Sequence, residues 1–237
     1  MKTDVKNEYT KFHLNKESKH NYPTEWVIRT MLGNYPELTL DRSKYPGGNI
    51  LDLGFGDGRN MQLLNNCGLN ISGVEITEET CTLVTEKLKK INIAADLRVG
   101  TNTKIPFDND MFDYVLASSS CYYVDSGTTF KDNLNEISRV LRKGGYLVAN
   151  FPVFTPDIKM IEESFILKDC KHTEDGHIII HNDIYGIRNG YKFKAFGDEQ
   201  DLKESLSVQF EDICIGKLYD HYYGVQINTL IVTCRKN

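Results

Sequence analysis

The sequence has no apolar run long enough to cross a membrane and no N-terminal signal peptide, so we expect a cytoplasmic protein without a membrane partner. Its six cysteines are scattered and include no CxxC pair, which argues against a zinc site and against a disulfide framework. We therefore expect no bound metal. Dense lysine and arginine runs are also missing, and the net charge of −5 disfavours a general nucleic-acid binder.

What is present suits one α/β domain. The 237 residues are enough to bury a sizeable core. A hydrophobic content of 40% and a charged content of 26% are ordinary for a globular chain. No internal repeat or low-complexity tract divides the sequence, and its oligomeric state stays open.

The most informative stretch runs from Asn49 to Asn60 and reads N-I-L-D-L-G-F-G-D-G-R-N. Its apolar residues predict a short buried strand that ends at three closely spaced glycines. Residues 60–66 then predict a helix that Gly68 ends. Such a strand, turn and helix are typical of a nucleotide-cofactor loop. Glycine lets a ligand lie against the backbone, and the helix N-terminus offers free N–H groups.

The spacing of the glycines narrows the choice of cofactor. A dinucleotide fingerprint, G-x-G-x-x-G, would require glycine at position 59, which is Arg59. The acid before the glycines, Asp52, suits a ligand that carries a cation. The stretch L-D-L-G-F-G-D-G resembles the first motif of class I S-adenosylmethionine (SAM)-dependent methyltransferases, of the small-molecule, type 11-like kind. The resemblance implies SAM as the cofactor, bound in part by Asp52, Gly54, Phe55, Gly56 and Asn60.

A second acid follows one strand later. Residues 70–76 predict a strand, and Glu75 near its end lies 19 residues after Gly56. A carboxylate there can accept hydrogen bonds from both ribose hydroxyls, with Ile76 beside it. NAD-binding proteins share this feature, so it does not discriminate between the cofactors. The alternative is a surface carboxylate in a strand-to-helix turn.

The segment after the third predicted strand, 96–99, also resembles the family. G-T-N-T-K-I-P-F-D-N-D-M-F-D, from Gly100, resembles the pattern G-D-A-x-x-L-P-F-x-D-x-x-F-D: its P-F and F-D elements are intact, but Thr101 stands where the usual acid follows the glycine. The resemblance implies that this segment lies beside adenine. The hydroxyl of Thr101 can bond the adenine amino group without a full charge, and the backbone N–H of Asn102 can serve a ring nitrogen.

The fourth predicted strand, 114–118, leads into S-S-S-C-Y-Y. Open α/β sheets bind ligands outside the carboxyl ends of their strands, so residues 118–123 should border both the sulfonium of the cofactor and the substrate, with Ser118 near the cofactor. Tyr122 and Tyr123 are candidates to line the substrate pocket or to act as a catalytic base. They are poor bases at an ordinary tyrosine pKa near 10. Filling core space is the alternative.

A second block supports the resemblance. Residues 134–147, L-N-E-I-S-R-V-L-R-K-G-G-Y-L, match the family pattern L-x-E-x-x-R-V-L-x-x-G-G-x-L. The apolar face, the basic last turn and the two glycines predict a helix followed by a buried strand. Packing and capping explain all of these residues, so we assign them no catalytic role.

Residues 151–205 form the region where family members differ, and we expect them to build part of the acceptor pocket. A helix is predicted over 158–167, and strands over 177–181 and 191–196 are predicted to pair around the turn 188–190. A further helix is predicted over 198–205. The candidate polar residues are His177, His181, Tyr185 and Arg188. A lone strand histidine is usually structural or exposed.

Both ends of the chain add candidates. Residues 1–46 are predicted to cap the cofactor, with a helix from Thr24 to Gly33 whose apolar positions are Val27, Ile28, Met31 and Leu32. Tyr22 and Trp26 are candidates to contact the cofactor, although Trp26 could simply anchor the helix. At the other end, strands are predicted over 208–223 and 226–234. An aromatic turn over 219–224 holds His221, another catalytic candidate.

The resemblance implies a single SAM-dependent methyltransferase domain over 1–237. Its fold would be α/β: a Rossmann-like seven-stranded sheet in the order 3-2-1-4-5-7-6, the last strand antiparallel, with helices on both faces. The expected activity is methyl transfer to a small polar acceptor, for example a hydroxyl of a sugar or metabolite. Alternatives are a SAM-binding protein without catalysis, an NAD-type oxidoreductase, and an RNA or protein methyltransferase.

Overall fold

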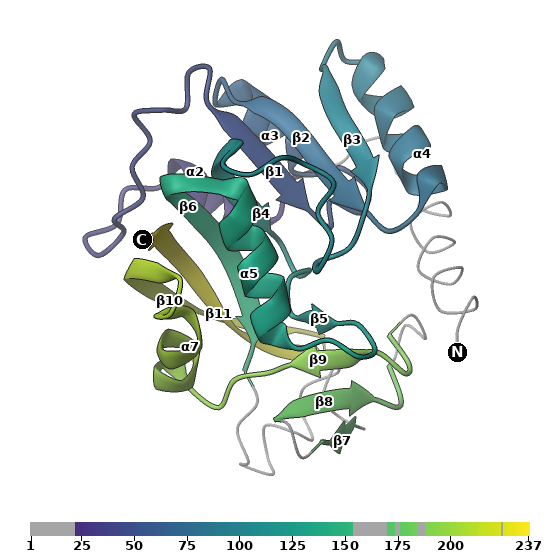
Figure 1. Cartoon of the computed structure of the whole chain (residues 1–237), viewed down its shortest axis with the longest axis vertical. Helices are drawn as coiled ribbons and strands as arrows, with labels where there is room; N and C mark the ends of the chain where they lie inside the picture. The colour runs from purple at the N-terminus through teal and green to yellow at the C-terminus, as the bar shows by residue number, and fades with distance from the viewer. Residues whose placement is uncertain (1–21, 154–169, 174–175, 184–187, 224) are drawn as a thin grey trace.

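The computed structural model describes residues 22–153, 170–173, 176–183, 188–223 and 225–237. A seven-stranded sheet with the neighbour order β3-β2-β1-β4-β6-β11-β10 forms its centre (Figure 1). These strands are β1 (Asn49–Leu53), β2 (Asn70–Glu75), β3 (Ala95–Val99), β4 (Phe112–Ala117), β6 (Leu141–Pro152), β10 (Phe210–Tyr222) and β11 (Val225–Lys236). Numbered along the chain, they have the predicted order 3-2-1-4-5-7-6. The last strand, β11, is antiparallel to both neighbours, which confirms the expected fold class.

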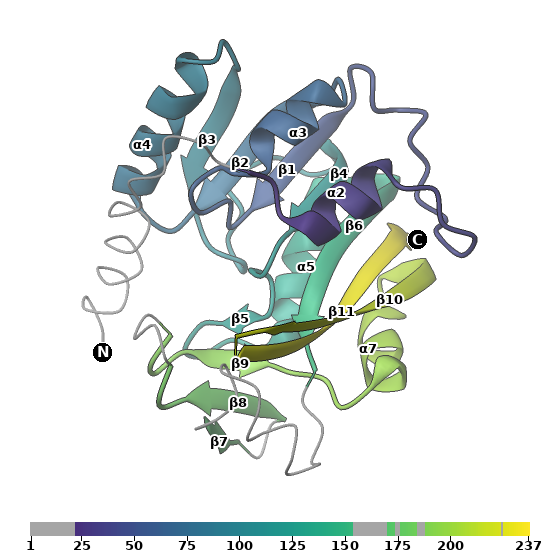
Figure 2. The same cartoon turned by 180° about the vertical axis from the view of Figure 1, so that it is seen from behind.

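Helices cover both faces of this sheet (Figures 1 and 2). They are α2 (Glu25–Leu32), α3 (Met61–Asn66), α4 (Glu78–Lys89), α5 (Phe130–Val140) and α7 (Glu199–Leu206). Successive strand residues point to opposite faces, so Ile50 packs with α2, α3 and α4 while Leu51 packs with α5 and α7. The sheet therefore separates two apolar cores. No helix of the described residues is long and apolar enough to cross a membrane.

The predicted N-terminal helix is present, but its buried face differs from the expected one. Ile28 is 36% exposed and Leu32 is 55% exposed, whereas Trp26 and Val27 are buried. Trp26 belongs to the same apolar core as Val27, Met31 and Ile50, so its indole forms part of the buried face of the helix. The side chain of Thr24 makes no capping bond. Its backbone N–H instead donates to Asn60 Oδ1 at 3.0 Å and joins the start of α2 to the glycine turn.

A second, smaller sheet has the order β5-β9-β8-β7. Its strands are β5 (Tyr123–Val124), β7 (Cys170–His172), β8 (His177–Ile180) and β9 (Lys192–Lys194). The predicted pairing of the last two is confirmed. The connection is wider than a tight Asn-Gly hairpin, because the strands stop at Ile180 and resume at Lys192, and the N–H of Gly190 closes the loop onto Ile180 O. The helix predicted over 158–167 lies outside the described residues.

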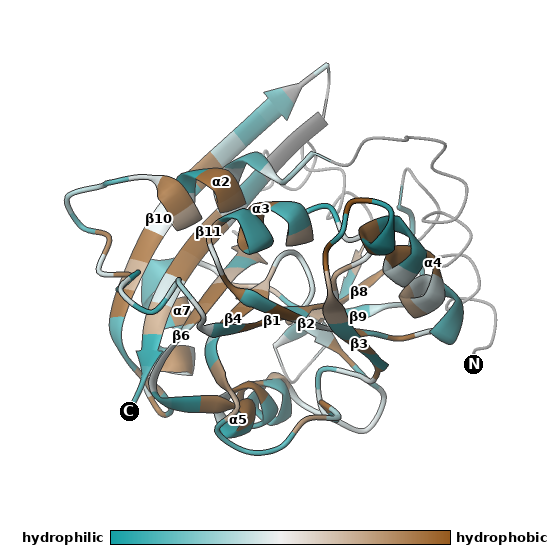
Figure 3. Cartoon of the chain, turned by 90° about the horizontal axis from the view of Figure 1, so that it is seen from above, coloured by the Kyte–Doolittle hydropathy of each residue, from teal (hydrophilic) through white to brown (hydrophobic). Residues whose placement is uncertain are grey.

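The two predicted C-terminal strands form a hairpin, in which β10 ends at Tyr222 and β11 begins at Val225. The aromatic turn expected over 219–224 is shorter than predicted, because Tyr219 to Tyr222 still pair with β11. β11 pairs with β6 only as far as Thr229, which lies opposite Pro152. The far ends of β10 and β11 therefore project past the carboxyl end of β6, as Figure 3 shows. This projection brings a part of the chain near the C-terminus to the same edge as the glycine turn.

Candidate active site

The turn between β1 and α3 requires its glycines. Gly54, Gly56 and Gly58 have φ angles of 69°, 56° and 74°, in the left-handed region that side chains rarely adopt. A Cβ at Gly54 would also lie 2.4 Å from Ser120 Cβ. Arg59 occupies the place of a dinucleotide fingerprint's third glycine, and its guanidinium bonds both oxygens of Asp57, at 2.8 and 2.6 Å.

Asp52 is an unusual group at the end of β1. Its side chain is 1% exposed, and neither oxygen has a hydrogen-bond partner among the residues that the structure describes. Burial raises the pKa of Asp52 to about 8, with the nearby negative charges of Glu75 and Asp57 adding to the rise. A buried carboxylate without a partner is costly unless a cation compensates it. This site therefore fits a positively charged ligand.

Glu75 ends β2 with a carboxylate held by two backbone donors. Gly56 N donates to its Oε1 at 3.0 Å, and Ile76 N donates to its Oε2 at 2.7 Å. Burial raises the pKa of Glu75, and these two hydrogen bonds oppose the rise. The carboxylate is thus fixed against the glycine turn and keeps lone pairs for a ligand's hydroxyls.

A cavity of about 650 Å³ opens in front of this carboxylate, and we call it the cofactor crevice. The carboxyl ends of β1 and β2 and the segment just after β4 form its floor, the loop after β3 forms one side, and β8 and β9 form another. Seven of the predicted site residues line it: Gly54, Glu75, Ile76, Thr101, Asn102, Tyr123 and His181. The described part of the 151–205 region therefore borders this crevice.

Other predicted residues lie elsewhere. Asp52, Phe55, Gly56, Asn60, Ser118, Tyr22, Trp26, Tyr122 and His221 are not among the residues that line the crevice. Tyr22 is 78% exposed, and Phe55 is buried in the core. Trp26 and His221 line the second cavity described below. Tyr185 lies outside the described residues.

The adenine-side loop is tied to the segment after β4. Asn102 Nδ2 donates to the backbone oxygens of Ser120 and Tyr123, each at 3.0 Å. Thr101 Oγ1 lies 3.3 Å from Thr103 Oγ1, with either atom as donor. The side chain of Asn102 therefore holds the loop after β3 against the segment after β4. The sequence predicts a contact only for its backbone N–H.

Tyr122 and Tyr123 belong to a buried aromatic group. Their rings stack with centroids 5.1 Å apart, and each meets Phe193 edge-on. Burial raises the pKa of both phenols, which makes neither a ready proton acceptor. Arg188, another candidate, forms an ion pair with the buried Asp183 at 3.2 Å. His177 is buried in β8.

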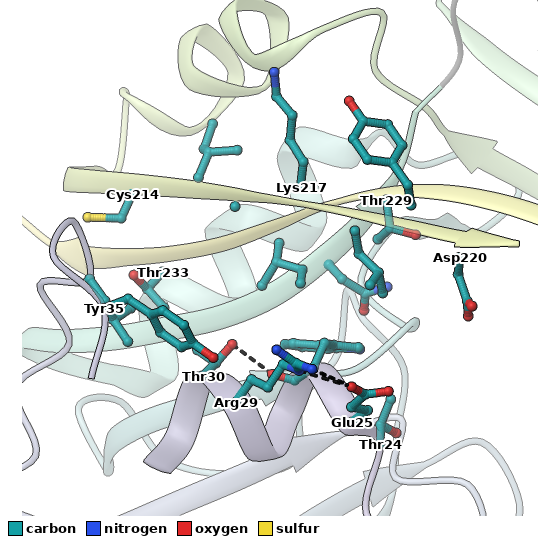
Figure 4. A pocket seen from close by; sticks show the side chains of 18 of the residues that line it. Thr24, Glu25, Arg29, Thr30, Tyr35, Cys214, Lys217, Asp220, Thr229 and Thr233 are labelled. Atoms are coloured by element: carbon teal, nitrogen blue, oxygen red, sulfur yellow. Dashed lines mark hydrogen bonds and ion pairs between the residues drawn. The ribbon is translucent and has the colours of Figure 1, made fainter. Parts of the chain in front are cut away.

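A second cavity, of about 1130 Å³, lies between α2 and the face of β10 and β11 (Figure 4), and we call it the α2–β10 groove. Ser119, just after β4, lines both this groove and the cofactor crevice. Its φ is 57°, and its N–H donates to Asn150 Oδ1 at 2.7 Å. Ser119 thus marks the place where the two cavities meet.

Strand alternation decides which side chains of β10 face the groove. Lys217 points away and pairs with Glu199 of α7 at 2.5 Å, whereas Asp220 points toward α2 (Figure 4). By the same alternation His221 belongs to the side of Lys217, although it borders the groove. On α2, Arg29 is paired with Glu25 at 2.8 Å. Asp220 is therefore a better-placed polar group than the predicted His221.

Sequence reasoning did not find Asn150, Asp220 or Thr233 as site residues, and it did not single out Ser119. Ser119 lay within the segment 118–123 that was expected to border the cofactor and the substrate. The other three are single residues inside strands, and only the strand pairing shows which face they occupy. Within the described part of the chain, no group of three His, Cys, Asp or Glu residues is placed to hold a metal ion.

Comparisons with known proteins agree with this geometry. Residues 51–149 match the family model described as a methyltransferase domain. The PH0226 protein from Pyrococcus horikoshii is 18% identical with a TM-score of 0.59, and the match covers 96% of this chain and 99% of that one. A SAM-dependent methyltransferase from Methanosarcina mazei is 18% identical with a TM-score of 0.59, and the match covers 86% of this chain and 98% of that one. A possible histamine N-methyltransferase from Thermotoga maritima is 17% identical with a TM-score of 0.58, and the match covers 98% of this chain and 100% of that one. No curated protein sequence matches the chain.

Proposed function

We propose that the chain, whose residues 51–149 match the model of a methyltransferase domain, is a class I SAM-dependent methyltransferase that methylates a hydroxyl of a small polar acceptor, such as a sugar or metabolite. The observation that carries the proposal is the position of Ser119, which borders both the cofactor crevice and the α2–β10 groove. A cofactor in the crevice would present its reactive end to the groove at this residue. The groove is then the acceptor site.

The crevice suits the cofactor at each of its parts. Bound SAM would supply a methyl group activated by a positively charged sulfonium. Glu75 is proposed to accept hydrogen bonds from the ribose hydroxyls, and Thr101 and Asn102 to flank adenine. Leu53 and Gly54 line the crevice, and Asp52 lies beneath them without lining it. Its carboxyl is protonated near neutral pH without ligand, and in its ionised form it would attract the cation of a bound cofactor.

At the acceptor end, Asp220 is proposed to orient the reacting hydroxyl. A carboxylate that accepts the hydroxyl's hydrogen bond leaves an oxygen lone pair free to attack the methyl group, and it can take the proton as the new bond forms. Alignment of the two reactants would supply much of the acceleration. Asn150 would hold Ser119 in place through the 2.7 Å hydrogen bond to its N–H.

The test is an assay with methyl-labelled SAM over a panel of sugars and hydroxylated metabolites, with products identified by mass spectrometry. We expect one added methyl group on a hydroxyl oxygen. Asp220→Asn should lower turnover at least tenfold while SAM affinity stays unchanged, and His221→Gln should have a small effect. Methylation of amines alone would contradict the hydroxyl proposal. SAM binding without transfer to any acceptor would favour a SAM-binding protein that lacks catalysis.

A further inference from the structure

The α2–β10 groove contains a buried hydroxyl that nothing within the described ranges satisfies. Thr233 of β11 is 2% exposed and lines the groove, and its Oγ1 has no hydrogen-bond partner there. It lies on the side of β11 that faces α2 (Figure 4). The hydroxyl of Thr30, across the groove, differs because it donates to Trp26 O at 2.8 Å. Buried polar groups are almost always paired, so the Thr233 hydroxyl calls for a ligand.

The position of Thr233 sets a length for that ligand. Thr229 and Thr233 lie on the same face of β11, four residues apart, which corresponds to about 13 Å of strand. Between them the groove is lined by Ile231 of β11, which pairs with Gly216 of β10, and Leu218 of β10 lies opposite Thr229. Trp26 of α2 adds a third apolar side chain to the groove. The surface therefore has a polar group at Ser119, an apolar stretch at Leu218 and Ile231, and a second polar group at Thr233.

The charges of the groove exclude one class of ligand. Arg29 is occupied by Glu25, and Lys217 points to Glu199 on the opposite face. The carboxylates of Glu37 and Asp220 also border the groove, and neither forms an ion pair within the described part of the chain. A negatively charged acceptor would be repelled here.

We propose that the α2–β10 groove binds an elongated, uncharged acceptor with an apolar body and a hydroxyl at each end, one presented at Ser119 and the other bonded to Thr233. This inference rests on the proposed function and narrows its acceptor class. The far hydroxyl satisfies Thr233 Oγ1, while the apolar body covers Ile231 and Leu218. Short polar molecules would leave Thr233 unpaired.

The experiment measures binding of rigid probes to the protein saturated with S-adenosylhomocysteine (SAH), by calorimetry. The probes are 4,4′-dihydroxybiphenyl, 4-hydroxybiphenyl, hydroquinone and 4′-hydroxybiphenyl-4-carboxylate. We expect the dihydroxybiphenyl to bind best and loss of one hydroxyl to weaken binding about tenfold, the effect of one hydrogen bond. Thr233→Val, which keeps the side-chain shape, should remove this difference. Thr85→Val is the control, because its hydroxyl donates to Cys81 O at 2.8 Å in α4.

The outcomes separate the two proposals. If SAH does not bind, the proposed function fails whatever the probes do. Suppose instead that SAH binds, but Thr233→Val weakens the binding of 4,4′-dihydroxybiphenyl and of 4-hydroxybiphenyl equally, or of neither. The proposed role of Thr233 is then wrong. Preference for the carboxylate probe or for hydroquinone would overturn the proposed charge or length of the acceptor while leaving methyl transfer intact.

Discussion

Two buried carboxyl groups lie at the cofactor crevice: Glu75 lines it, and Asp52 lies beneath its floor. Glu75 is held by two backbone N–H groups, whereas Asp52 has no hydrogen-bond partner among the described residues. The same burial raises the pKa of both, but only Asp52 lacks donors that would oppose the rise. Asp52 is therefore the group whose protonation responds most to a bound cation.

The raised pKa of Asp52 predicts a stability that falls as pH rises. The folded protein keeps a proton on Asp52 up to about pH 8, whereas the unfolded chain releases it near the ordinary value of 3.8. Between these values, stability falls with rising pH by up to about 1.4 kcal/mol per pH unit from this group. Urea unfolding at pH 5 and pH 8 should show this slope in the wild type, without ligand, and lose it in Asp52→Asn. Equal slopes in the two proteins would contradict the assignment.

Glu75→Gln should weaken SAM binding by roughly 10- to 100-fold, because hydrogen bonds to a charged group are worth about 1.5–3 kcal/mol. The substituted amide keeps the shape of the side chain but loses the charge that both ribose hydroxyls are proposed to share. Isothermal titration measures the change. Glu79→Gln, an exposed acid in the first turn of α4, is the matched control and should bind as the wild type does. Unchanged affinity in Glu75→Gln would remove Glu75 from the cofactor site.

At the scale of elements, the β1–α3 turn depends on close packing as well as on backbone conformation. Gly54 and Gly127 both have positive φ, 69° and 83°. A Cβ at Gly54 would meet Ser120, whereas a Cβ at Gly127 would meet nothing within 4 Å. Comparing the two substitutions separates the cost of strain from the cost of overlap.

Gly127→Ala should cost about 1–2 kcal/mol of stability, the usual cost of left-handed backbone. Gly54→Ala should cost a further ~1–3 kcal/mol from overpacking, and it should also weaken SAM binding. Chemical denaturation of both variants measures the difference. Equal losses would show that Ser120 moves aside and that the turn is not tightly packed.

Elements whose signals are local could be predicted from the sequence. The glycine turn, the strand that ends at Glu75 and the helix before Gly144 each carry their own periodicity. The predicted end of that helix is wrong, because α5 ends at Val140 and the two glycines already belong to β6. The buried face of α2 could not, because it depends on how Trp26 meets the sheet. The position of the turn between β10 and β11 could not either, since the aromatic and glycine residues of 219–224 favour a turn but pairing with β11 keeps Tyr219 to Tyr222 in the strand.

At the scale of the whole molecule, the two cavities differ in how far sequence could predict them. The crevice is built mainly by turns that follow successive strands, so motif spacing brings Gly54, Glu75 and Thr101 together. The groove joins α2, β6, β10 and β11, and its key side chains depend on strand register. Register is set by tertiary pairing, which the motifs do not encode.

The central claim is that SAM lies in the crevice with its sulfur facing the groove at Ser119. A crystal structure of the protein with SAH tests it most directly. The account predicts ribose hydroxyls within hydrogen-bond distance of the Glu75 carboxylate, adenine beside Thr101 and Asn102, and the sulfur directed at Ser119. An empty crevice, or SAH seated in the α2–β10 groove instead, would contradict it.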